Sequence, residues 1–508
     1  MKKWLPFLAV FTLGVLLRFY KLGIIPLGYT WDEVSTIYDA WGLALWHRDQ
    51  YASFLPLTFK SFGDYKAPLM FYLLAIPYKL FGLSEILIRI YSAIAGMIII
   101  ITTYFLSLEI FPKKKKIALL AAFLIALSPW AIQFSRFGFD GNIALALTSL
   151  AILFLIKGEK KPSAWIISAI IFAASLYAYQ SVKIFVPLIL LAYLVFKRKL
   201  LRQKIKKLFI PSVVFLILIA PLIYSLVFSG AAERGKSLIF FDQNGQINTA
   251  QAITTEFFHN LSNQLSPSFW IKGYDASTLR HSVPGHGTLY KIEAFFFLLG
   301  IVFLTRQKNQ NKSFILSWLF IGLLPAILSH TTPHASRSLA TLPAPQLIAS
   351  FGFITIIKKL TNKSLQVSRL LIIASFVILS FESISYLTYY YNQYKINSAT
   401  SFNFGYKQAI TIAKEKAKTK DTVVFTDKYG QPYIFILLYQ RTTPEEFLAG
   451  GLANYFIAPV KWPPDKPNSV YVATPEEIPP DDPFVTDTIS IPNTKDIIFV
   501  IAETPKTL

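Results

Sequence analysis

About eleven apolar segments, each close to the length of a membrane-spanning helix, divide this chain of 508 residues. An α-helix that crosses the hydrocarbon core needs about 20 mostly apolar residues. The composition agrees, because 54% of the residues are hydrophobic, well above the share of a soluble domain. We therefore predict a polytopic α-helical membrane protein with spans near residues 4–22, 89–111, 117–134, 140–157, 163–180, 183–197, 208–228, 289–305, 313–329, 338–357 and 367–390.

The positive charges lie in short runs between these segments, and their placement predicts the orientation of the chain. If Met1 is cytoplasmic and each segment crosses once, every run falls on the cytoplasmic side, as the positive-inside rule expects. These loops account for the formal net charge of +22, so we exclude a nucleic-acid partner. The runs are Lys113 to Lys116, Lys157 with Lys160 and Lys161, residues 197–207, Arg306 with Lys308 and Lys312, and Lys358 and Lys359 with Lys363.

Two further assignments depend on flanking residues. The first segment begins like a signal peptide, but Arg18 to Lys21 follow it in place of a small-residue cleavage site. We predict an uncleaved first helix with these residues as an interfacial anchor. Residues 69–81 are also apolar, but counting them as a span would move Lys113 to Lys116 to the outside. With Pro77 and Lys79, they are predicted to form a helix in the outer interface.

The same topology places four regions outside: the loops 23–88 and 229–288, and the tips 135–140 and 330–337. After the last span the composition changes. Behind a transmembrane domain of residues 1–390, we predict a small soluble extracytoplasmic α/β domain of residues 391–508. An amphipathic helix is expected at 403–418, and short buried strands at 422–425, 470–472 and 497–500.

The first outer loop opens with two adjacent carboxylates, Asp32 and Glu33, beside Trp31. Ionisable groups held against a membrane are costly, which makes them functional candidates. Thr30 and Glu33 also fit a capping box, in which Glu33 closes the first turn of a helix. Because neighbouring helical residues point about 100° apart, Asp32 can face a substrate while Glu33 caps. The apolar stripe that follows suits either a helix lying on the bilayer or core packing: Val34, Ile37, Tyr38, Trp41 and Leu45.

Four isolated cations lie on the same outer side: Lys66, Arg89, Arg136 and Arg337. Lys66 precedes Pro68, a suitable first residue of a helix, and a cation beside the amides of a helix start suits a phosphate. The alternatives are snorkelling for Lys66 and interface anchoring for the arginines. Together, the carboxylates and cations predict a site for a lipid-linked phosphate, with a base for an incoming hydroxyl.

Signals for other chemistries are absent from the sequence. We find no Walker-type loop, no His-Glu-x-x-His, no nucleophile elbow and no glycine-rich dinucleotide turn. The absence of cysteine excludes disulfides and thiolate metal sites. The histidines of the outer regions have spacings that fit no known metal pattern, so we predict no required cofactor and no metal ligand, although a divalent metal is conceivable; they are His259, His281, His286, His330 and His334.

At these positions the chain resembles the GT-C membrane glycosyltransferases. Within them it is most similar to the dolichyl-phosphate-mannose–protein mannosyltransferase family, which includes the bacterial lipid A aminoarabinose transferases. The resemblance is strong in the first helices, loose in the later ones, and extends to the C-terminal domain only through its layout. It is carried by Asp32 with Glu33, Lys66-Ala67-Pro68-Leu69, residues 84–89 with Ser92, Ala93 and Gly96, Ser135-Arg136 with Asp140, and Arg337-Ser338-Leu339 with Pro343.

The resemblance implies an inverting sugar transfer from a polyprenyl-phosphate-linked donor, on the extracytoplasmic face, to a protein, lipid or glycan acceptor. Asp32 would be the base for the acceptor hydroxyl, with Glu33 beside it. Lys66 and Arg89 would bind the donor phosphate, with Arg136 and Arg337 as weaker assignments. The family's Lys-Pro-Pro or His-Pro-Pro stretch has Ala67 in second place here, which alters the loop but keeps the charge of the lysine. Further candidates for contacts with acceptor or sugar are Trp31, Asp64, Tyr65 and Asp140.

Three other functions are compatible with many apolar helices and charges at the membrane surface. A transporter or flippase of lipid-linked saccharides is the main alternative, but such proteins tend to show repeat symmetry and ionisable groups near the bilayer midplane. A non-catalytic scaffold leaves Asp32 without a role. An oligosaccharide polymerase or ligase also acts on a lipid-linked sugar.

Overall fold

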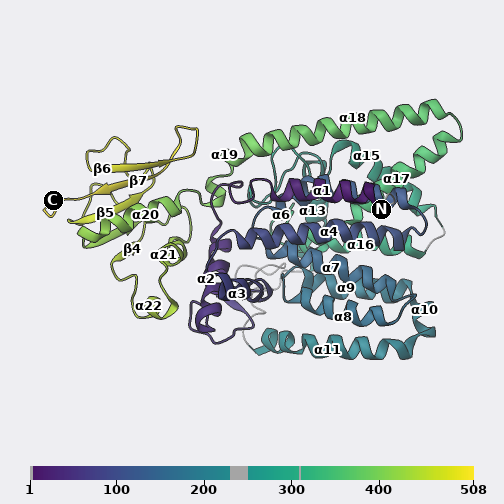
Figure 1. Ribbon diagram of the computed structural model, residues 1–508, viewed down its shortest axis with the longest axis horizontal. Coiled ribbons are helices and arrows are strands. Elements are labelled where there is room, and N and C mark those ends of the chain that lie inside the picture. Colours follow the sequence, from purple (N-terminus) through teal and green to yellow (C-terminus); the bar gives the residue numbers. More distant parts are fainter. Residues whose placement is uncertain (1–3, 229–249, 308–309, 508) are drawn as a thin grey trace. The chain divides into compact units, whose positions relative to one another are not determined.

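The computed structural model describes residues 4–228, 250–307 and 310–507 (Figure 1). Three parts of the sequence-based predictions lie outside these residues: the first part of the outer loop 229–288, Lys308 of one basic run, and Met1 to Lys3. The chain divides into two compact units. Unit 1 comprises Met1–Leu22, Tyr65–Leu69 and Arg89–Tyr390, and unit 2 comprises Gly23–Asp64, Met70–Ile88 and Tyr391–Leu508.

Unit 1 is built from apolar helices, and each of the predicted spanning segments coincides with a helix or with a bent helix pair. Neighbouring pairs in the bundle include α1 with α5, α7 with α8, α8 with α11, and α15 with α17. The helices are α1 (Leu5–Phe19), α4 (Leu87–Ile110), α5 (Lys115–Leu127), α6 (Pro129–Ser135), α7 (Asp140–Lys157), α8 (Ser163–Leu176), α9 (Val182–Phe196), α10 (Arg198–Gln203), α11 (Ile205–Phe228), α13 (Ala250–Gln264), α14 (Pro267–Trp270), α15 (Lys291–Thr305), α16 (Gln310–Ile327), the short 3₁₀ helix η1 (Leu339–Thr341), α17 (Ala344–Thr361) and α18 (Leu365–Tyr389).

Length and composition identify the helices that can cross a membrane. Among the described residues, 5 helices are long and apolar enough, or up to 6 if the bent pair α5–α6 is one span. Other apolar helices of 10–17 residues, such as α1, α8 and α9, accompany them. The best window of α11 is only 17% buried and that of α18 only 22%, so their apolar side chains are available to lipid. The polytopic helical class is confirmed, and the count of eleven spans remains a prediction.

The break between α5 and α6 has a local cause. The two helices are bent by 56° at Ser128. Ser128 caps α6, since its hydroxyl accepts a hydrogen bond from the Ala131 N–H at 3.3 Å, and Pro129 occupies the first helical position. A proline cannot donate to the preceding turn, so the last carbonyls of α5 need other partners.

Helices α15 and α17 approach each other closely at two glycines. A Cβ atom on Gly300 would meet the Ile348 carbonyl oxygen, and one on Gly352 would meet the Phe296 carbonyl oxygen. Small residues allow helix backbones to touch in membrane proteins. The two helices therefore approach closely along their middle turns.

Unit 2 contains a five-stranded mixed sheet with the strand order β4-β3-β5-β7-β6. Strand β3 pairs in parallel with β4 and β5, whereas β7 pairs antiparallel with β5 and β6. Helix α20 packs on β5 and β7, and α21 packs on α20 (Figure 1). The C-terminal elements are α19 (Lys395–Asn397), α20 (Tyr406–Lys416), η4 (Ala417–Thr419), β3 (Thr422–Phe425), α21 (Pro432–Gln440), α22 (Pro444–Leu448), β4 (Tyr455–Ile457), β5 (Ser469–Ala473), β6 (Val485–Ser490) and β7 (Ile497–Glu503).

The first outer loop contains α2 (Trp31–Trp46), the paired strands β1 (Phe59–Ser61) and β2 (Asp64–Lys66), and α3 (Leu69–Phe81). Helix α2 is buried continuously from Glu33 to Ala44, and it packs against α21 of the same unit. Of its predicted apolar stripe, only Leu45 is exposed. The structure therefore favours core packing over a helix lying on the bilayer, because polar and apolar faces of α2 are covered alike.

Candidate active-site residues

The two carboxylates at the start of α2 have different surroundings. The Thr30 N–H donates to Glu33 Oε2 at 2.9 Å, and the Glu33 N–H donates to Thr30 Oγ1 at 3.1 Å. These two bonds form the predicted capping box, and Glu33 is fully buried. Asp32, one residue earlier, is exposed. The cap thus uses Glu33 and leaves Asp32 at the surface of unit 2.

The C-terminal part of the chain holds this helix start in place. The Trp31 N–H donates to Asn403 Oδ1 at 3.3 Å, and the amide nitrogen of Asn403 donates to the Tyr429 carbonyl at 2.9 Å. Further along α2, the Tyr38 hydroxyl donates to the Thr442 carbonyl at 2.8 Å. No local sequence signal reports these contacts, since the partners are about 370 to 400 residues apart along the chain.

A third carboxylate of α2, Asp39, is structural. It is fully buried and accepts two hydrogen bonds from Gln50, from the backbone N–H at 2.9 Å and from the side-chain amide at 3.1 Å. The hydroxyl of Tyr433 lies 3.1 Å from Gln50 Oε1. This chain of hydrogen bonds links α2 to the following loop and to α21, and it satisfies a charge that would be costly to bury alone.

The predicted phosphate-binding segment around Lys66 is anchored through its backbone in unit 1. The Tyr65 carbonyl accepts from Gln180 Nε2 at 3.1 Å, and the Leu69 N–H donates to the Tyr177 carbonyl at 3.0 Å. Asp64, Tyr65 and Lys66 are half-buried, and α3 begins three residues after the lysine. Two backbone atoms of the segment, the Tyr65 carbonyl and the Leu69 N–H, thus hold it against the residues that follow α8.

Two of the predicted phosphate-binding arginines lie against the end of α1. Arg136 is fully buried, and its guanidinium donates to the carbonyls of Leu17 at 2.9 Å, Arg18 at 3.2 Å and Tyr20 at 2.8 Å. Arg89, also fully buried, donates to the Leu22 carbonyl at 3.4 Å. The last carbonyls of a helix lack intrahelical partners, and cations near them are favourable. Both arginines therefore have a structural role, because they satisfy carbonyls at and just after the end of α1.

Arg18 corrects an expectation from the sequence. We predicted an interfacial anchor, but Arg18 is fully buried and donates to the carbonyls of Ala126 at 3.1 Å and Ile125 at 3.2 Å. These carbonyls belong to the last turn of α5, before the break at Pro129. The guanidinium supplies the donors that the interrupted helix lacks.

The other candidates in unit 1, Asp140 and Arg337, are less buried than Arg89 and Arg136. Asp140 is half-buried in the first turn of α7 and accepts from the Gly141 N–H at 3.0 Å. Arg337 is half-buried in the tip after α16, where it donates to the Thr331 hydroxyl at 3.2 Å. Acidic residues in a first helical turn commonly stabilise the helix, so Asp140 also has a structural role at the start of α7.

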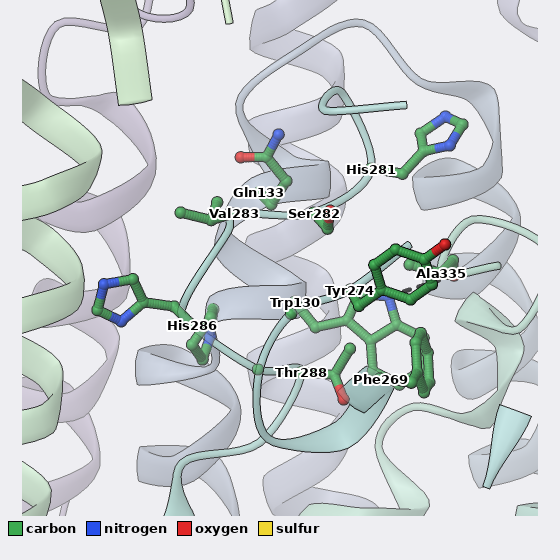
Figure 2. Close-up of a pocket in the computed structure, with 13 residues that line it drawn as sticks. Trp130, Gln133, Phe269, Tyr274, His281, Ser282, Val283, His286, Thr288 and Ala335 are labelled. Carbon is green, nitrogen blue, oxygen red and sulfur yellow. Dashed lines mark hydrogen bonds between the residues drawn. The ribbon is translucent and has the colours of Figure 1, made fainter. Parts of the chain in front are cut away.

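Asp275, His281 and His334 form a further cluster, which their spacing in the sequence does not predict. One ligand atom from each lies within 4.8 Å of the others, close enough to suggest metal binding. His281 also lines a small pocket with aromatic side chains, and Figure 2 shows it on the opposite side from His286. The sequence analysis named His281 and His334 but did not connect them with Asp275, because two separate loops supply the three residues, the one after α14 and the one after α16. The prediction of no metal ligand stays a prediction.

Comparisons with known proteins agree with this architecture. Residues 65–224 match the sequence model of the family described as dolichyl-phosphate-mannose-protein mannosyltransferase. No curated protein matches the sequence. ArnT from Cupriavidus metallidurans, solved with undecaprenyl phosphate, is 12% identical with a TM-score of 0.56, over 98% of this chain and 97% of that chain.

Archaeal oligosaccharyltransferases are similar in structure too. AglB from Archaeoglobus fulgidus, solved with an inhibitory peptide and a dolichol-phosphate, is 13% identical with a TM-score of 0.53, over 94% of this chain and 70% of that chain. The apo form of the Archaeoglobus fulgidus oligosaccharyltransferase is 14% identical with a TM-score of 0.52. The match covers 85% of this chain and only 63% of that chain. The fold is that of the GT-C membrane glycosyltransferases.

The resemblance to GT-C enzymes predicted from the first loop is thereby confirmed, and so is the membrane location. The matched segment starts at Tyr65, so it contains Lys66, Arg89, Arg136 and Asp140. It does not contain Asp32, Glu33 or Arg337. The roles of all these residues stay predictions.

His334, in the tip before α17, gives the protein a pH-dependent stability. Burial, then the neighbouring His281 and Arg337, hold the pKa of His334 well below its usual range. Unfolded chains bind more protons than the folded protein between that lowered pKa and about 6.5. Stability is therefore present in full above about pH 6.5 and is lost as the pH falls.

We expect the melting midpoint to fall on acidification below about pH 6.5, and to fall less in His334→Gln. The measurement is thermal unfolding of the purified protein in chelator between neutral and mildly acidic pH. His259→Gln, at an exposed position, is the control and should follow the wild type. Equal pH profiles for the wild type and His334→Gln would contradict this account.

Proposed function

We propose that this protein is an inverting glycosyltransferase that moves a sugar, hexosyl or pentosyl, from a polyprenyl-phosphate-linked donor to an acceptor hydroxyl at the outer face of the membrane. The observation that carries the proposal is the structural similarity to ArnT along nearly the whole of both chains, since that relative was solved with undecaprenyl phosphate. The matched mannosyltransferase segment supports the same reaction class.

In the proposed reaction, Asp32 takes the proton of the acceptor hydroxyl as the oxygen attacks the anomeric carbon. The bond from that carbon to the phosphate oxygen breaks, through an oxocarbenium-like state, and polyprenyl phosphate leaves. The exposed position of Asp32 and the engagement of Glu33 in the cap support Asp32 as the base. Glu33 then acts beside it, by fixing the helix start.

Cations around the leaving phosphate stabilise the charge that develops on it. We assign this task first to Lys66, and then to Arg89 and Arg337. Arg136 is the weakest of the four, because its guanidinium already donates to three carbonyls of the α1 end. Trp31, Asp64, Tyr65 and Asp140 are proposed to contact the acceptor or the sugar.

The donor carries its own leaving group, so the proposed chemistry needs neither a nucleotide nor a metal ion. We place Met1 in the cytoplasm and the C-terminal domain, residues 391–508, outside, because this orientation puts every basic run on the cytoplasmic side. Protein, lipid and glycan acceptors all fit the proposal.

The test is transfer from radiolabelled polyprenyl-phosphate sugars by the purified protein in lipid vesicles, with a panel of hydroxyl acceptors. Release of polyprenyl phosphate together with a labelled product of inverted anomeric configuration is the expected result. Movement of intact donor between leaflets, without any labelled product, would instead identify a flippase and overturn the proposal.

A further inference from the structure

Asp275, His281 and His334 are held together by a network that joins two loops of unit 1. The Ala335 N–H donates to Asp275 Oδ2 at 2.6 Å, and the Ala276 N–H donates to the Pro333 carbonyl at 2.9 Å. The fully buried Gln264, the last residue of α13, holds the second loop, since its Oε1 accepts from the His334 N–H at 3.0 Å. The three side chains thus meet on a fixed backbone.

The surroundings of both imidazoles are those of oriented ligands. Ser277 Oγ lies 2.8 Å from His281 Nδ1 and is also hydrogen-bonded to Asp275. Ser336 Oγ lies 3.1 Å from His334 Nδ1. Hydrogen bonds to one ring nitrogen fix the tautomer and the direction of a histidine that ligates metal through the other. The two ring centroids are 5.2 Å apart.

The donor set selects the class of metal. Two imidazoles and one carboxylate form the three-ligand arrangement in which zinc is commonly bound, with the fourth position taken by water or substrate. Calcium and magnesium prefer oxygen ligands throughout. His334 is only 5% exposed, so its imidazole is presented to the other two ligands from a largely buried position.

We propose that Asp275, His281 and His334 form a Zn²⁺ site that clamps the loop after α14 to the loop after α16. Zinc bonds of about 2.0–2.2 Å require ligand atoms about 3.4 Å apart in a tetrahedral site, so the cluster closes by at most about 1.4 Å from its present limit of 4.8 Å. Because His281 also lines the aromatic pocket, the ion fixes one of its walls (Figure 2). The proposal does not depend on the sugar-transfer reaction.

The test is zinc binding to the full-length protein, purified without a histidine tag, stripped with chelator and titrated with ZnCl₂. Calorimetry and elemental analysis should give about one Zn²⁺ per wild-type chain, and the melting midpoint should rise by several degrees with zinc. His281→Ala and His334→Ala should lose the bound zinc and the rise. Ser277→Ala, which removes a partner of a ligand, should weaken zinc binding by about tenfold or more.

His259→Ala, at an exposed histidine outside the cluster, is the matched control and should bind zinc as the wild type does. Melting curves in chelator show whether each variant is folded, so loss of zinc from a folded variant is distinguished from misfolding. The proposal is overturned if the wild type binds no zinc, or if folded His281→Ala and His334→Ala bind as much as the wild type. Binding of magnesium but not zinc would also overturn it.

Discussion

Asp32→Asn is expected to lower kcat for sugar transfer by about 10²–10⁴-fold, the usual contribution of a positioned general base. Asparagine keeps the shape and the first-turn position of Asp32 but cannot accept the proton of the acceptor. The side chain is exposed and takes no part in the capping box of α2, so the substitution leaves both capping hydrogen bonds in place. Single-turnover transfer in lipid vesicles, with melting curves as the check on folding, measures the effect.

Two variants separate the base from its neighbours. Glu33→Gln should lower stability more than catalysis, because Glu33 is buried and its carboxylate accepts the Thr30 N–H. Lys66→Met should raise KM for the polyprenyl-phosphate donor, as expected for loss of a phosphate contact, with melting curves as the check on folding. If Asp32→Asn transfers sugar at the wild-type rate while Glu33→Gln does not, the base is Glu33 and the assignment is wrong.

The capping role of Glu33 could be predicted from the sequence because a capping box is local. Its two hydrogen bonds depend only on residues three positions apart, and both are present. The helical segments could be predicted for a similar reason, since their apolar composition is a property of each segment alone. Strand β3 was predicted at its observed bounds, whereas β4 and β6, short or rich in polar residues, were missed.

The side-chain contacts that the sequence did not reveal depend on distant pairs. The sequence predicts Arg18 to be an interfacial residue. In the structure it donates to carbonyls at the end of α5, which are more than 100 positions away along the chain. Asp275 and His334 are 59 positions apart, since 334 − 275 = 59, and meet only because two loops are joined. Such contacts need the packed chain, because no spacing rule connects their residues.

Helix α2 shows how a distant pair can matter for the proposed chemistry. Its first N–H groups are satisfied by Thr30 locally and by Asn403 from the C-terminal part of unit 2. Asn403 itself has a positive φ of 52°, a conformation that asparagine tolerates better than most residues. The C-terminal domain is therefore part of the support of the helix that carries Asp32, whatever else it does with the acceptor.

Arg136→Met is the second large expected effect, and it concerns stability. Methionine has similar bulk but removes the hydrogen bonds to the carbonyls of Leu17, Arg18 and Tyr20, and the stacking on Tyr390 at 5.5 Å. A buried hydrogen bond from a charged group contributes about 1.5–3 kcal/mol, and an acceptor left buried without a donor adds to the loss. We expect the free energy of unfolding to fall by about 3 kcal/mol or more, seen as a lower melting midpoint.

Arg337→Met is the matched control, because Arg337 is half-buried whereas Arg136 is fully buried. It should change stability by less than about 1 kcal/mol. Arg136→Lys should rescue Arg136→Met only in part, since one ammonium cannot reproduce the geometry of a guanidinium that reaches three carbonyls. A structural role predicts that the KM for the donor stays unchanged in the Arg136→Met protein that remains folded. If instead that KM rises and the melting midpoint does not move, Arg136 binds the donor phosphate and the support of α1 is the lesser of its tasks.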